Sequence, residues 1–162
     1  MDVIILDSEF DPWASVAEYQ NKHIPEGKHG ASVTFIGSMR DFNDGVNELS
    51  TMYLDHYPGM TEKHIKDVCN DALKKWDVID ALVVHRVGYI KPNDSIVLVA
   101  VWSEHRAMAF DACRFIINDL KHRAPFWKKE ANKNGERWVE GNTVDSTADV
   151  HSLEVAKSKN VI

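Results

Sequence analysis

The first half of the chain contains three segments with the pattern of a β-strand. Residues 2–6 form a short apolar run, and residues 31–37 alternate apolar with small polar side chains and are rich in β-branched residues. Residues 49–56 return to a strand pattern after a loop over 40–48 that is rich in Asp, Asn and Gly. These three segments are the first predicted strands of a sheet.

Three segments have helical patterns. Residues 12–19 follow Asp11, which is a good N-cap, and carry a proline in the first turn. Residues 61–76 begin at a second capping residue, Thr61, and residues 103–121 form the longest helical segment. The apolar stripe of this last helix consists of Ala109, Ala112, Cys113, Ile116 and Leu120.

The second half of the chain adds further strands. Residues 81–84 and 96–101 are apolar runs joined through a turn at 91–94, whose Pro, Asn and Asp suit an antiparallel pair. Residues 137–139 predict a short final strand. Strand pairs followed by single helices, rather than regular alternation, predict an α+β fold in which helices cover a mixed or antiparallel sheet.

The size and hydropathy of the chain predict one soluble domain. Its 162 residues suffice for one domain with a proper core but are cramped for two. We expect a single α+β domain over 1–142 and a C-terminal extension over 143–162, of the kind that is often mobile. No apolar run approaches the roughly 18 to 20 residues that span a bilayer, and the N-terminus lacks a basic signal-peptide segment, so we expect a cytoplasmic protein.

Charge and motif content exclude several function classes. Acidic residues outnumber basic ones by 25 to 19, which argues against general nucleic-acid binding. Cys69 and Cys113 both fall in predicted helices, where buried apolar thiols explain them better than a disulfide or a metal site. The chain has no dinucleotide fingerprint, no phosphate-binding glycine loop and no zinc-ligand spacing, so neither a cofactor nor a metal is predicted.

Residues 121–130 concentrate positive charge beside aromatic side chains in this acidic chain. The three basic residues at 121–123 close the predicted long helix, where cations favour the negative end of the helix dipole. That explanation does not extend to Lys128 and Lys129, which follow the proline that stops the helix. We therefore prefer a binding site for an anion over a solvated face, although packing explains the two aromatic residues at 126–127 well.

A second candidate anion site lies at the start of the long helix. Amide groups in a first helical turn have no intrahelical partner, and His105 with Arg106 adds donors that suit a phosphate. The alternative is that Ser103 caps the helix while both basic side chains are solvated. Cations in a first turn oppose the helix dipole, which favours a ligand. Arg40, just after a predicted strand, is placed to enter a cleft.

The spacing of these basic residues bears on the oligomeric state. His105 and Lys121 are sixteen residues apart on one predicted helix, which separates them by about 24 Å. One small-molecule site is too small to hold both from the same chain. If both serve one anionic substrate, the simplest geometry brings His105 and Arg106 of one subunit against Lys121 and Lys128 of its twin. This conditional argument predicts a homodimer.

Lysine is the leading candidate for direct chemistry, because no hydroxyl or thiol lies in a recognisable nucleophile motif. A lysine serves as a nucleophile or as an acid and base when a neighbouring cation or an apolar wall favours its neutral form. Phe126, Trp127 and Lys128 offer such surroundings to Lys121.

Five motifs occur in order within residues 30–140. They are FIGSMR at 35–40, HYPGM at 56–60, VHRVG at 84–88, SEHR at 103–106 and KHRAPFWK at 121–128. Together they resemble the large, catalytic subunit of molybdopterin synthase. The resemblance implies an α+β fold of hammerhead type. It also implies a sulfurtransferase that inserts sulfur into cyclic pyranopterin monophosphate to make the dithiolene of molybdopterin.

The resemblance further implies a partner and a set of site residues. Sulfur would come from a small ubiquitin-like subunit whose C-terminal Gly-Gly thiocarboxylate enters the large subunit, in a heterotetramer of two large and two small subunits. Lys121 matches the catalytic lysine and Lys128 its supporting partner, whereas Arg40, His105 and Arg106 line the substrate pocket. A cyclic phosphate and a thiocarboxylate are both anionic, which explains a cationic pocket in an acidic protein.

Three features of the chain allow more than one interpretation. Phe35 either forms a wall of the tunnel for the carrier tail or is an ordinary buried strand aromatic. After the Trp-Val-Glu sequence at 138–140 the chain continues with Gly141 and Asn142, where the family often has another basic residue. Two other functions compete, namely a non-catalytic protein that binds an anion or a partner's tail, and an enzyme that uses Lys121 as a Schiff base.

Overall fold

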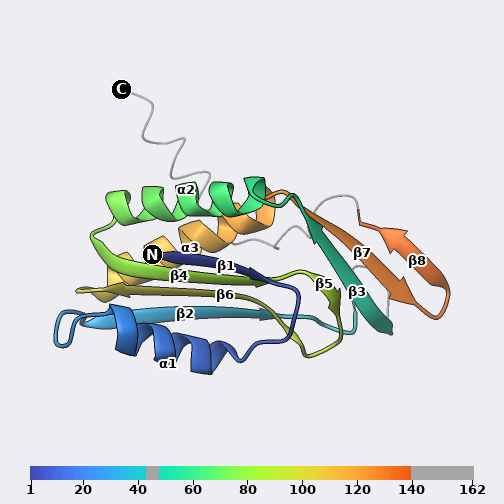
Figure 1. The fold of residues 1–162 in the computed structure, drawn as a ribbon, viewed down its shortest axis with the longest axis horizontal. Helices are drawn as coiled ribbons and strands as arrows, with labels where there is room; N and C mark the ends of the chain where they lie inside the picture. Colours follow the sequence, from blue (N-terminus) through green and yellow to red (C-terminus); the bar gives the residue numbers. More distant parts are fainter. Residues whose placement is uncertain (43–47, 140–162) are drawn as a thin grey trace.

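The computed structural model describes residues 1–42 and 48–139 and shows two four-stranded sheets in this part of the chain (Figure 1). The strands are β1 (Asp2–Leu6), β2 (Ala31–Ser38), β3 (Leu49–His56), β4 (Val78–Arg86), β5 (Gly88–Ile90), β6 (Ser95–Ser103), β7 (Phe126–Asn132) and β8 (Gly135–Trp138). The helices are α1 (Pro12–His23), α2 (Met60–Lys75) and α3 (Arg106–His122). The predicted extension over 143–162 and the centre of the 40–48 loop lie outside the described residues.

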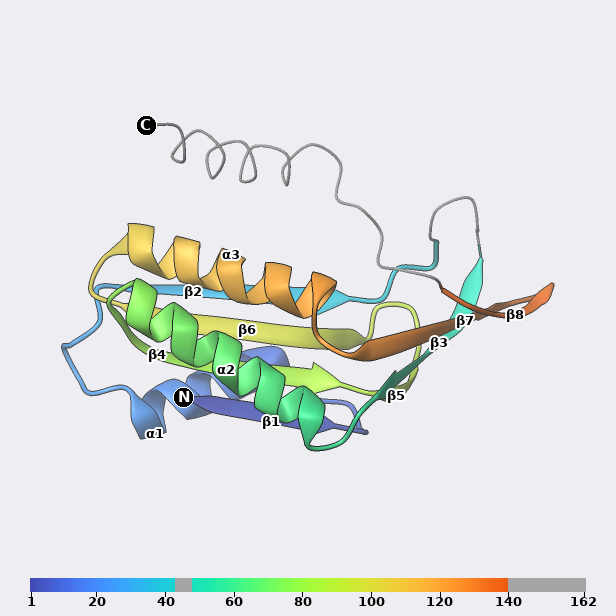
Figure 2. The ribbon, with the colours of Figure 1, turned by 90° about the horizontal axis from the view of Figure 1, so that it is seen from above.

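The first sheet has the strand order β1-β4-β6-β2 and is covered on both faces. Strand β1 is parallel to β4, whereas β6 is antiparallel to both β4 and β2. Helices α2 and α3 lie on one face and α1 lies on the other (Figures 1 and 2). Burial on both faces explains why the central strands β4 and β6 are continuous apolar runs.

Two apolar clusters hold the helices on this sheet. Under α2 and α3, small residues allow close approach of helix to strand; the buried members include Ile65, Cys69, Ala72, Ala112, Cys113 and Ile116. On the other face, Trp102 is fully buried and its indole N–H donates to Gln20 Oε1 at 2.9 Å. Tyr19 stacks on Trp102 and donates to Asp80 Oδ2 at 2.9 Å, so α1 is fastened by aromatic packing and two hydrogen bonds.

The second sheet has the order β5-β3-β7-β8 and projects beyond one end of the first (Figure 2). It joins the first sheet through a small cluster, which we call the seam cluster, made of Met39, Leu49, Met52, Leu54 and Ile90. Met39 comes just after β2, and its amide donates to Asp94 O at 3.0 Å. The loop after β2 therefore connects the end of one sheet to the buried face of the other.

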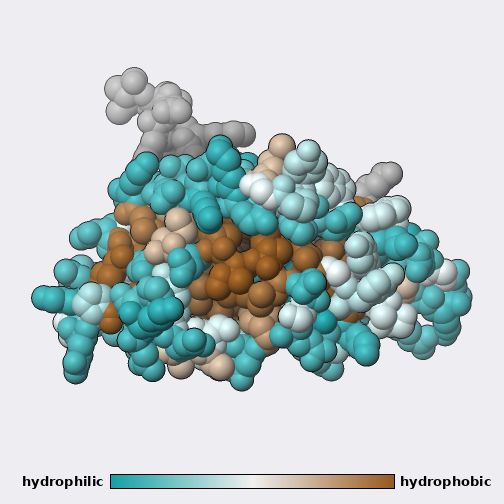
Figure 3. Space-filling model, in the orientation of Figure 1, coloured by the Kyte–Doolittle hydropathy of each residue, from teal (hydrophilic) through white to brown (hydrophobic). Residues whose placement is uncertain are grey.

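Strand β1 forms an open edge of the first sheet. Figure 3 shows apolar surface gathered in the middle of this side of the molecule, over β1 and between α1 and α2. Ile4 is 41% exposed there. Within the described residues, no helix is long and apolar enough to cross a membrane.

The predicted α+β fold is confirmed, and the predicted helices and strands are all present, most of them with longer bounds. The antiparallel pairing of the strands at 81–84 and 96–101 is also confirmed. Three expectations need correction. The strands form two sheets instead of one; β5 and β7 were not expected; and Ser103 ends β6 instead of beginning the helix. Ser103 belongs to the strand because it pairs with Ala31 of β2 and Val78 of β4, and its hydroxyl also donates to Asp77 O at 3.1 Å.

Candidate functional site

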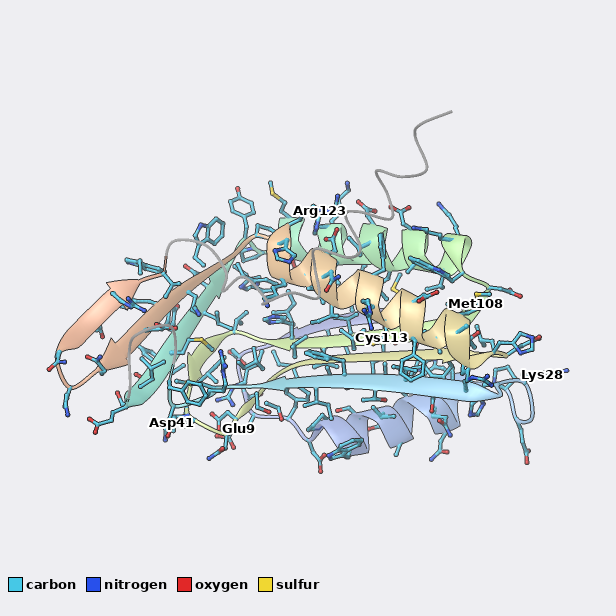
Figure 4. All side chains as sticks on the ribbon, turned by 180° about the vertical axis from the view of Figure 1, so that it is seen from behind. Glu9, Lys28, Asp41, Met108, Cys113 and Arg123 are labelled. Atoms are coloured by element: carbon cyan, nitrogen blue, oxygen red, sulfur yellow. The ribbon has the colours of Figure 1, made fainter. Side chains whose placement is uncertain are left out.

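The basic segment runs across the junction of α3 and the second sheet. Lys121 is half-buried in the last turn of α3, and Lys128 is half-buried on β7. Helix α3 ends because the amides of Arg123 and Ala124 both donate to the carbonyl of Asp119, at 2.8 and 3.3 Å. Figure 4 shows Arg123 at this end of α3, close to the second sheet.

The geometry of α3 over β2 places Lys121 near the loop that carries Arg40. Helix α3 and strand β2 run in the same direction (Figure 2), and the Cys113 thiol lies against the backbone of Phe35. Cys113, Ile117 and Lys121 follow at intervals of four on one face of the helix. Lys121 is then about 12 Å beyond Cys113, the length of three to four strand residues counted from Phe35. This step ends level with Ser38 and Met39, at the end of β2 where the loop with Arg40 begins.

Lys128 lies on the face of the second sheet that packs toward the first. It is directly opposite Leu54, a member of the seam cluster, and opposite residues of an antiparallel pair share a face. Its ammonium group lies 3.0 Å from Oε1 of Glu130, whose side chain is 3% exposed. Arg137 of β8 contacts the same carboxylate at 3.2 Å. Lys128 is therefore fixed in place by a buried acid.

The loop after β2, the end of α3 and the inward face of β7 all lie toward the junction of the two sheets, and we call their basic residues Arg40, Lys121 and Lys128 the corner site. Arg40 is exposed, and its guanidinium lies 4.8 Å from the centre of the Phe42 ring. Arg40 follows Met39 of the seam cluster, on which Leu54 opposite Lys128 also packs. Cations on three separate elements that approach one junction would suit an anion whose charge is spread over several atoms, so the corner site stays a predicted anion site.

His105 and Arg106 lie at the opposite end of α3. His105 is the N-cap residue and Arg106 the first helical residue, and both are exposed. Ser103 Oγ accepts from the His105 amide at 3.3 Å, but no side chain accepts from the first-turn amides of α3, so Ser103 is not the helix cap. In Figure 4, Met108 near the start of α3 lies at the same end of the molecule as Lys28, away from the second sheet. One chain therefore does not bring His105 or Arg106 to the corner site.

Phe35 lies on β2, an edge strand of the first sheet. Its side chain is 40% exposed, so it is not the buried strand aromatic that was the simpler explanation. Phe35 lies on the strand that ends two residues before Arg40. Its role as a wall for a carrier tail stays a prediction.

Two buried residues near the corner site had no predicted role. His85 stacks on Phe126, the first residue of β7, with ring centres 4.0 Å apart. Burial lowers the pKa of His85 to about 4, and its Nδ1–H donates to the carbonyl of Arg86 at 2.9 Å. Arg86 is 6% exposed and contacts Asp94 Oδ2 at 3.0 Å. Both residues belong to the motif at 84–88, and that motif is the sequence feature that could have indicated a role for them.

The described residues contain no group of three or more His, Cys, Asp or Glu side chains placed to hold a metal ion. Beside the buried Glu130, the β7–β8 hairpin encloses an open hollow of about 220 Å³, which is lined in part by Leu49, Asn132 and Arg137. The hollow borders Glu130, which binds Lys128, and it lies farther along the β7–β8 hairpin than Lys128 does.

Comparison with known proteins decides the family. The family described as "MoaE protein" matches residues 7–123. The chain belongs to the MoaE family. This match spans Arg40, His105, Arg106 and Lys121, and Lys128 follows it by five residues.

Relatives and solved structures of the MoaE family agree with this assignment. A molybdopterin synthase catalytic subunit from Ralstonia nicotianae is 48% identical over 144 residues, which cover 89% of this chain and 80% of the relative. The MoaE protein from Burkholderia ambifaria has a structure with a TM-score of 0.74 at 40% identity, covering 93% of this chain and 96% of that one. A complex of subunits 1 and 2 of molybdopterin-converting factor from Helicobacter pylori contains a chain with a TM-score of 0.72 at 19% identity, with coverages of 91% and 98%, which shows the fold alone.

Proposed function

We propose that this chain is the catalytic subunit of a molybdopterin synthase, a sulfurtransferase that inserts sulfur into cyclic pyranopterin monophosphate to form the dithiolene of molybdopterin. The observation that carries the proposal is the match to the MoaE family, and it is supported by the placement of Arg40, Lys121 and Lys128 on elements that border one junction of the fold. The substrate carries a cyclic phosphate, and the sulfur donor carries a thiocarboxylate. Both anions suit a site built from cations.

The sulfur donor in this proposal is a small ubiquitin-like subunit with a C-terminal Gly-Gly thiocarboxylate. The Helicobacter pylori relative in fold was solved as a complex of two subunits, which supports a two-subunit enzyme. Phe35 is exposed on the edge strand that leads to Arg40, and it serves as a wall for the entering tail. Such an enzyme works in the cytoplasm.

Lys121 and Lys128 act on the negative charge that develops during transfer. The thiocarboxylate sulfur bonds to a pterin carbon, and water then cleaves the bond between that sulfur and the carrier's acyl carbon, so the sulfur stays on the pterin and the carrier leaves as a carboxylate. Negative charge collects on the tetrahedral species of the cleavage, and positioned cations stabilise it. Lys128 is held by the buried Glu130, so it offers a cation of fixed position. Lys121 stands on a different element across the corner, and it also handles protons or the release of the carrier.

His105 and Arg106 complete the pocket from a second copy of the chain. Helix α3 separates them from Lys121 by about 24 Å within one chain. In a two-fold homodimer, each corner site receives the start of α3 from the twin subunit. The enzyme is then a heterotetramer of two large and two small subunits.

The first test is product formation. Purified protein is mixed with cyclic pyranopterin monophosphate and the thiocarboxylated small subunit, and molybdopterin is measured for the wild type, Lys121→Ala and Lys74→Ala. Lys74 is an exposed lysine in the last turn of α2, so it matches Lys121 in type and helix position. We expect product from the wild type and Lys74→Ala but not from Lys121→Ala.

The other outcomes separate the competing functions. If Lys121→Ala forms as much product as the wild type, the proposed activity stands but Lys121 is not a catalytic residue. If the wild type forms no product although the same small subunit is active with another synthase, the result favours a protein that binds anions without turnover. Trapping of a carbonyl substrate on Lys121 by borohydride would indicate a Schiff base instead.

The second test asks whether the site is shared between subunits. Lys121→Ala and Arg106→Ala chains are co-expressed and compared with each variant alone. A mixed dimer has one site with both defects and one intact site, so equal mixing restores about one quarter of the wild-type sites. If the mixture has no more activity than the two separate variants, the shared site is wrong.

A further inference from the structure

The last turn of α3 contains a buried carboxylate that none of the roles above uses. The side chain of Asp119 is 3% exposed. Its Oδ1 accepts from His64 Nε2 of α2 at 2.7 Å, and its Oδ2 pairs with the guanidinium of Arg123 one turn further along. A carboxylate is costly to bury unless it is paired and hydrogen-bonded. Asp119 therefore makes a specific contact between α2 and α3.

The main chain of the same aspartate ends the helix, because its carbonyl accepts from two amides that follow it. A short link then leads to Pro125, just before β7, and its carbonyl accepts from the Thr61 hydroxyl of α2 at 3.3 Å. Thr61 is fully buried and its Oγ1 also accepts from the Tyr57 amide at 3.1 Å. Two side chains of α2, His64 and Thr61, thus hold the link at both ends.

The two lysines of the corner site stand on either side of this link. Lys121 follows Asp119 by two residues, and Lys128 is the third residue of β7. Residues two apart on an α-helix point about 200° away from each other. Asp119 faces α2 while Lys121 faces away from it, so the aspartate acts on the lysine through the backbone of the last helical turn.

We propose that Asp119 is a positioning residue for the corner site, one that anchors the last turn of α3 to α2 through His64 and so sets where Lys121 stands relative to Lys128. The proposal rests on the proposed function, since the two lysines matter there as a pair. A displacement of about 1 Å at a reacting group is enough to slow catalysis by up to a hundredfold.

A purely structural role predicts something different. If Asp119 only stabilises the fold, its replacement lowers the fraction of folded protein and leaves the turnover of each folded molecule unchanged. If it positions Lys121, turnover per folded molecule falls, and the Michaelis constant for the small subunit stays the same because Phe35, the proposed wall for the carrier tail, is unchanged. The two roles are separated by measuring kcat and KM under conditions where every variant is folded.

The experiment uses Asp119→Asn, which keeps the shape of the side chain and removes its charge. The full enzyme with its small subunit is assayed, and we expect kcat to fall about tenfold. His64→Gln keeps a donor for Asp119 and is expected to retain more activity than His64→Leu. The matched control is Asp67→Asn, an exposed aspartate of α2 paired with Lys63 at 3.4 Å, which leaves kcat unchanged.

A double-mutant cycle connects the effect to the lysine. Lys121→Arg is combined with Asp119→Asn, and we expect the combined loss of kcat to be smaller than the product of the separate losses. Independent multiplication of the two losses would overturn the proposal. Wild-type kcat in folded Asp119→Asn would also overturn it, while the proposed function stands.

A second measurement decides the matter without turnover. Folded protein is treated with a trace of acetic anhydride, and acetylation of Lys121 is compared with that of Lys74 by mass spectrometry. Asp119→Asn is expected to shift the Lys121-to-Lys74 ratio, and Asp67→Asn is expected to leave it unchanged. An unchanged ratio in both variants refutes the positioning role even if the wild type forms no molybdopterin, an outcome that would refute the proposed function separately.

Discussion

The ammonium group of Lys128 lies 3.0 Å from the carboxylate of Glu130, two residues further along the same face of β7. Glu130 is 3% exposed and also binds Arg137, so one buried acid holds cations from two strands. A buried carboxylate that loses a partner is destabilised, because its remaining contacts must offset the cost of burial. Lys128 therefore contributes to the fold as well as to the corner site.

Replacing Lys128 is expected to destabilise the protein measurably. Lys128→Ala leaves Glu130 with fewer partners, and the free energy of unfolding should fall by about 1 to 3 kcal/mol. Lys133→Ala is the control: Lys133 is 72% exposed and pairs with Glu48 at the surface, so its loss should cost under about 0.5 kcal/mol. Urea unfolding of the two variants checks this, and equal midpoints would contradict it.

His85 is expected to make the protein less stable in acid. Its pKa is about 4 when folded, against an ordinary value of 6.5, because burial disfavours the charged ring. The unfolded chain therefore binds an extra proton as the pH falls from 6.5 toward 4. The free energy of unfolding should therefore fall by about 3 kcal/mol as the pH is lowered through this window. Above the window His85 is neutral in both states, and this part of the stability is fully present.

The measurement is urea unfolding at several pH values between neutral and the acid end of this window. His85→Gln should be less stable near neutrality but should show a flatter dependence on pH. His23→Gln, which changes an exposed histidine, should keep the wild-type slope. If the wild type and His85→Gln have parallel curves, His85 is not the group that titrates.

The two thiols are expected to be inert in the folded protein. Burial raises the pKa of Cys69 to about 12 and that of Cys113 to about 11, so little thiolate is present near neutral pH. Reaction with a chromogenic disulfide reagent should be slow without urea and should reach both thiols on unfolding. A fast phase of one thiol in native buffer would show that one helix opens locally.

Gly30 is expected to control the start of α3. Its amide donates to Ser103 O at 3.1 Å, and a methyl group added at Gly30 would overlap the carbonyl oxygen of Glu104, just before His105. Gly30→Ala should cost about 1 to 3 kcal/mol through overpacking and should lower synthase activity by displacing His105.

Gly27→Ala is the matched control for that change. Gly27 has a φ of +71°, and a methyl group added there meets nothing within 4 Å. Strain should cost it about 1 to 2 kcal/mol, with activity per folded molecule unchanged. Calorimetry and the molybdopterin assay on both variants check the pair. Full activity in Gly30→Ala would show that the start of α3 tolerates movement.

Sequence patterns predicted the elements whose burial follows a simple period. The strand at 96–101 is continuously apolar because α1 and the α2–α3 layer cover both of its faces. Strand β7 escaped prediction because its inward positions include Lys128 and Glu130, which compensate each other. A one-dimensional hydrophobic pattern does not reveal that two buried charges form a pair, nor that Arg137 on the next strand completes it.

The sequence predicted some parts of the candidate site and missed others. The rise of a helix correctly places His105 and Lys121 at opposite ends of α3. The five motifs correctly indicate the MoaE family. The pattern did not reveal Asp119, because an isolated aspartate near a helix end usually faces water. Its partner His64 is 55 residues earlier in the chain, and only packing of α2 on α3 brings them together.

The corner site straddles the boundary between the two sheets, which share packing through the seam cluster and through the stack of His85 on Phe126. Arg40 and Lys121 are carried by the first sheet and its helix, whereas Lys128 is carried by the second sheet. The spacing of the three cations therefore depends on how firmly the seam cluster, with its two flexible methionines, holds one sheet against the other, as well as on the anchor of α3 at Asp119. Substitutions at Met39 or Met52 should therefore change the turnover number of the enzyme. They would do so by changing the angle between the two sheets, without altering a charged group.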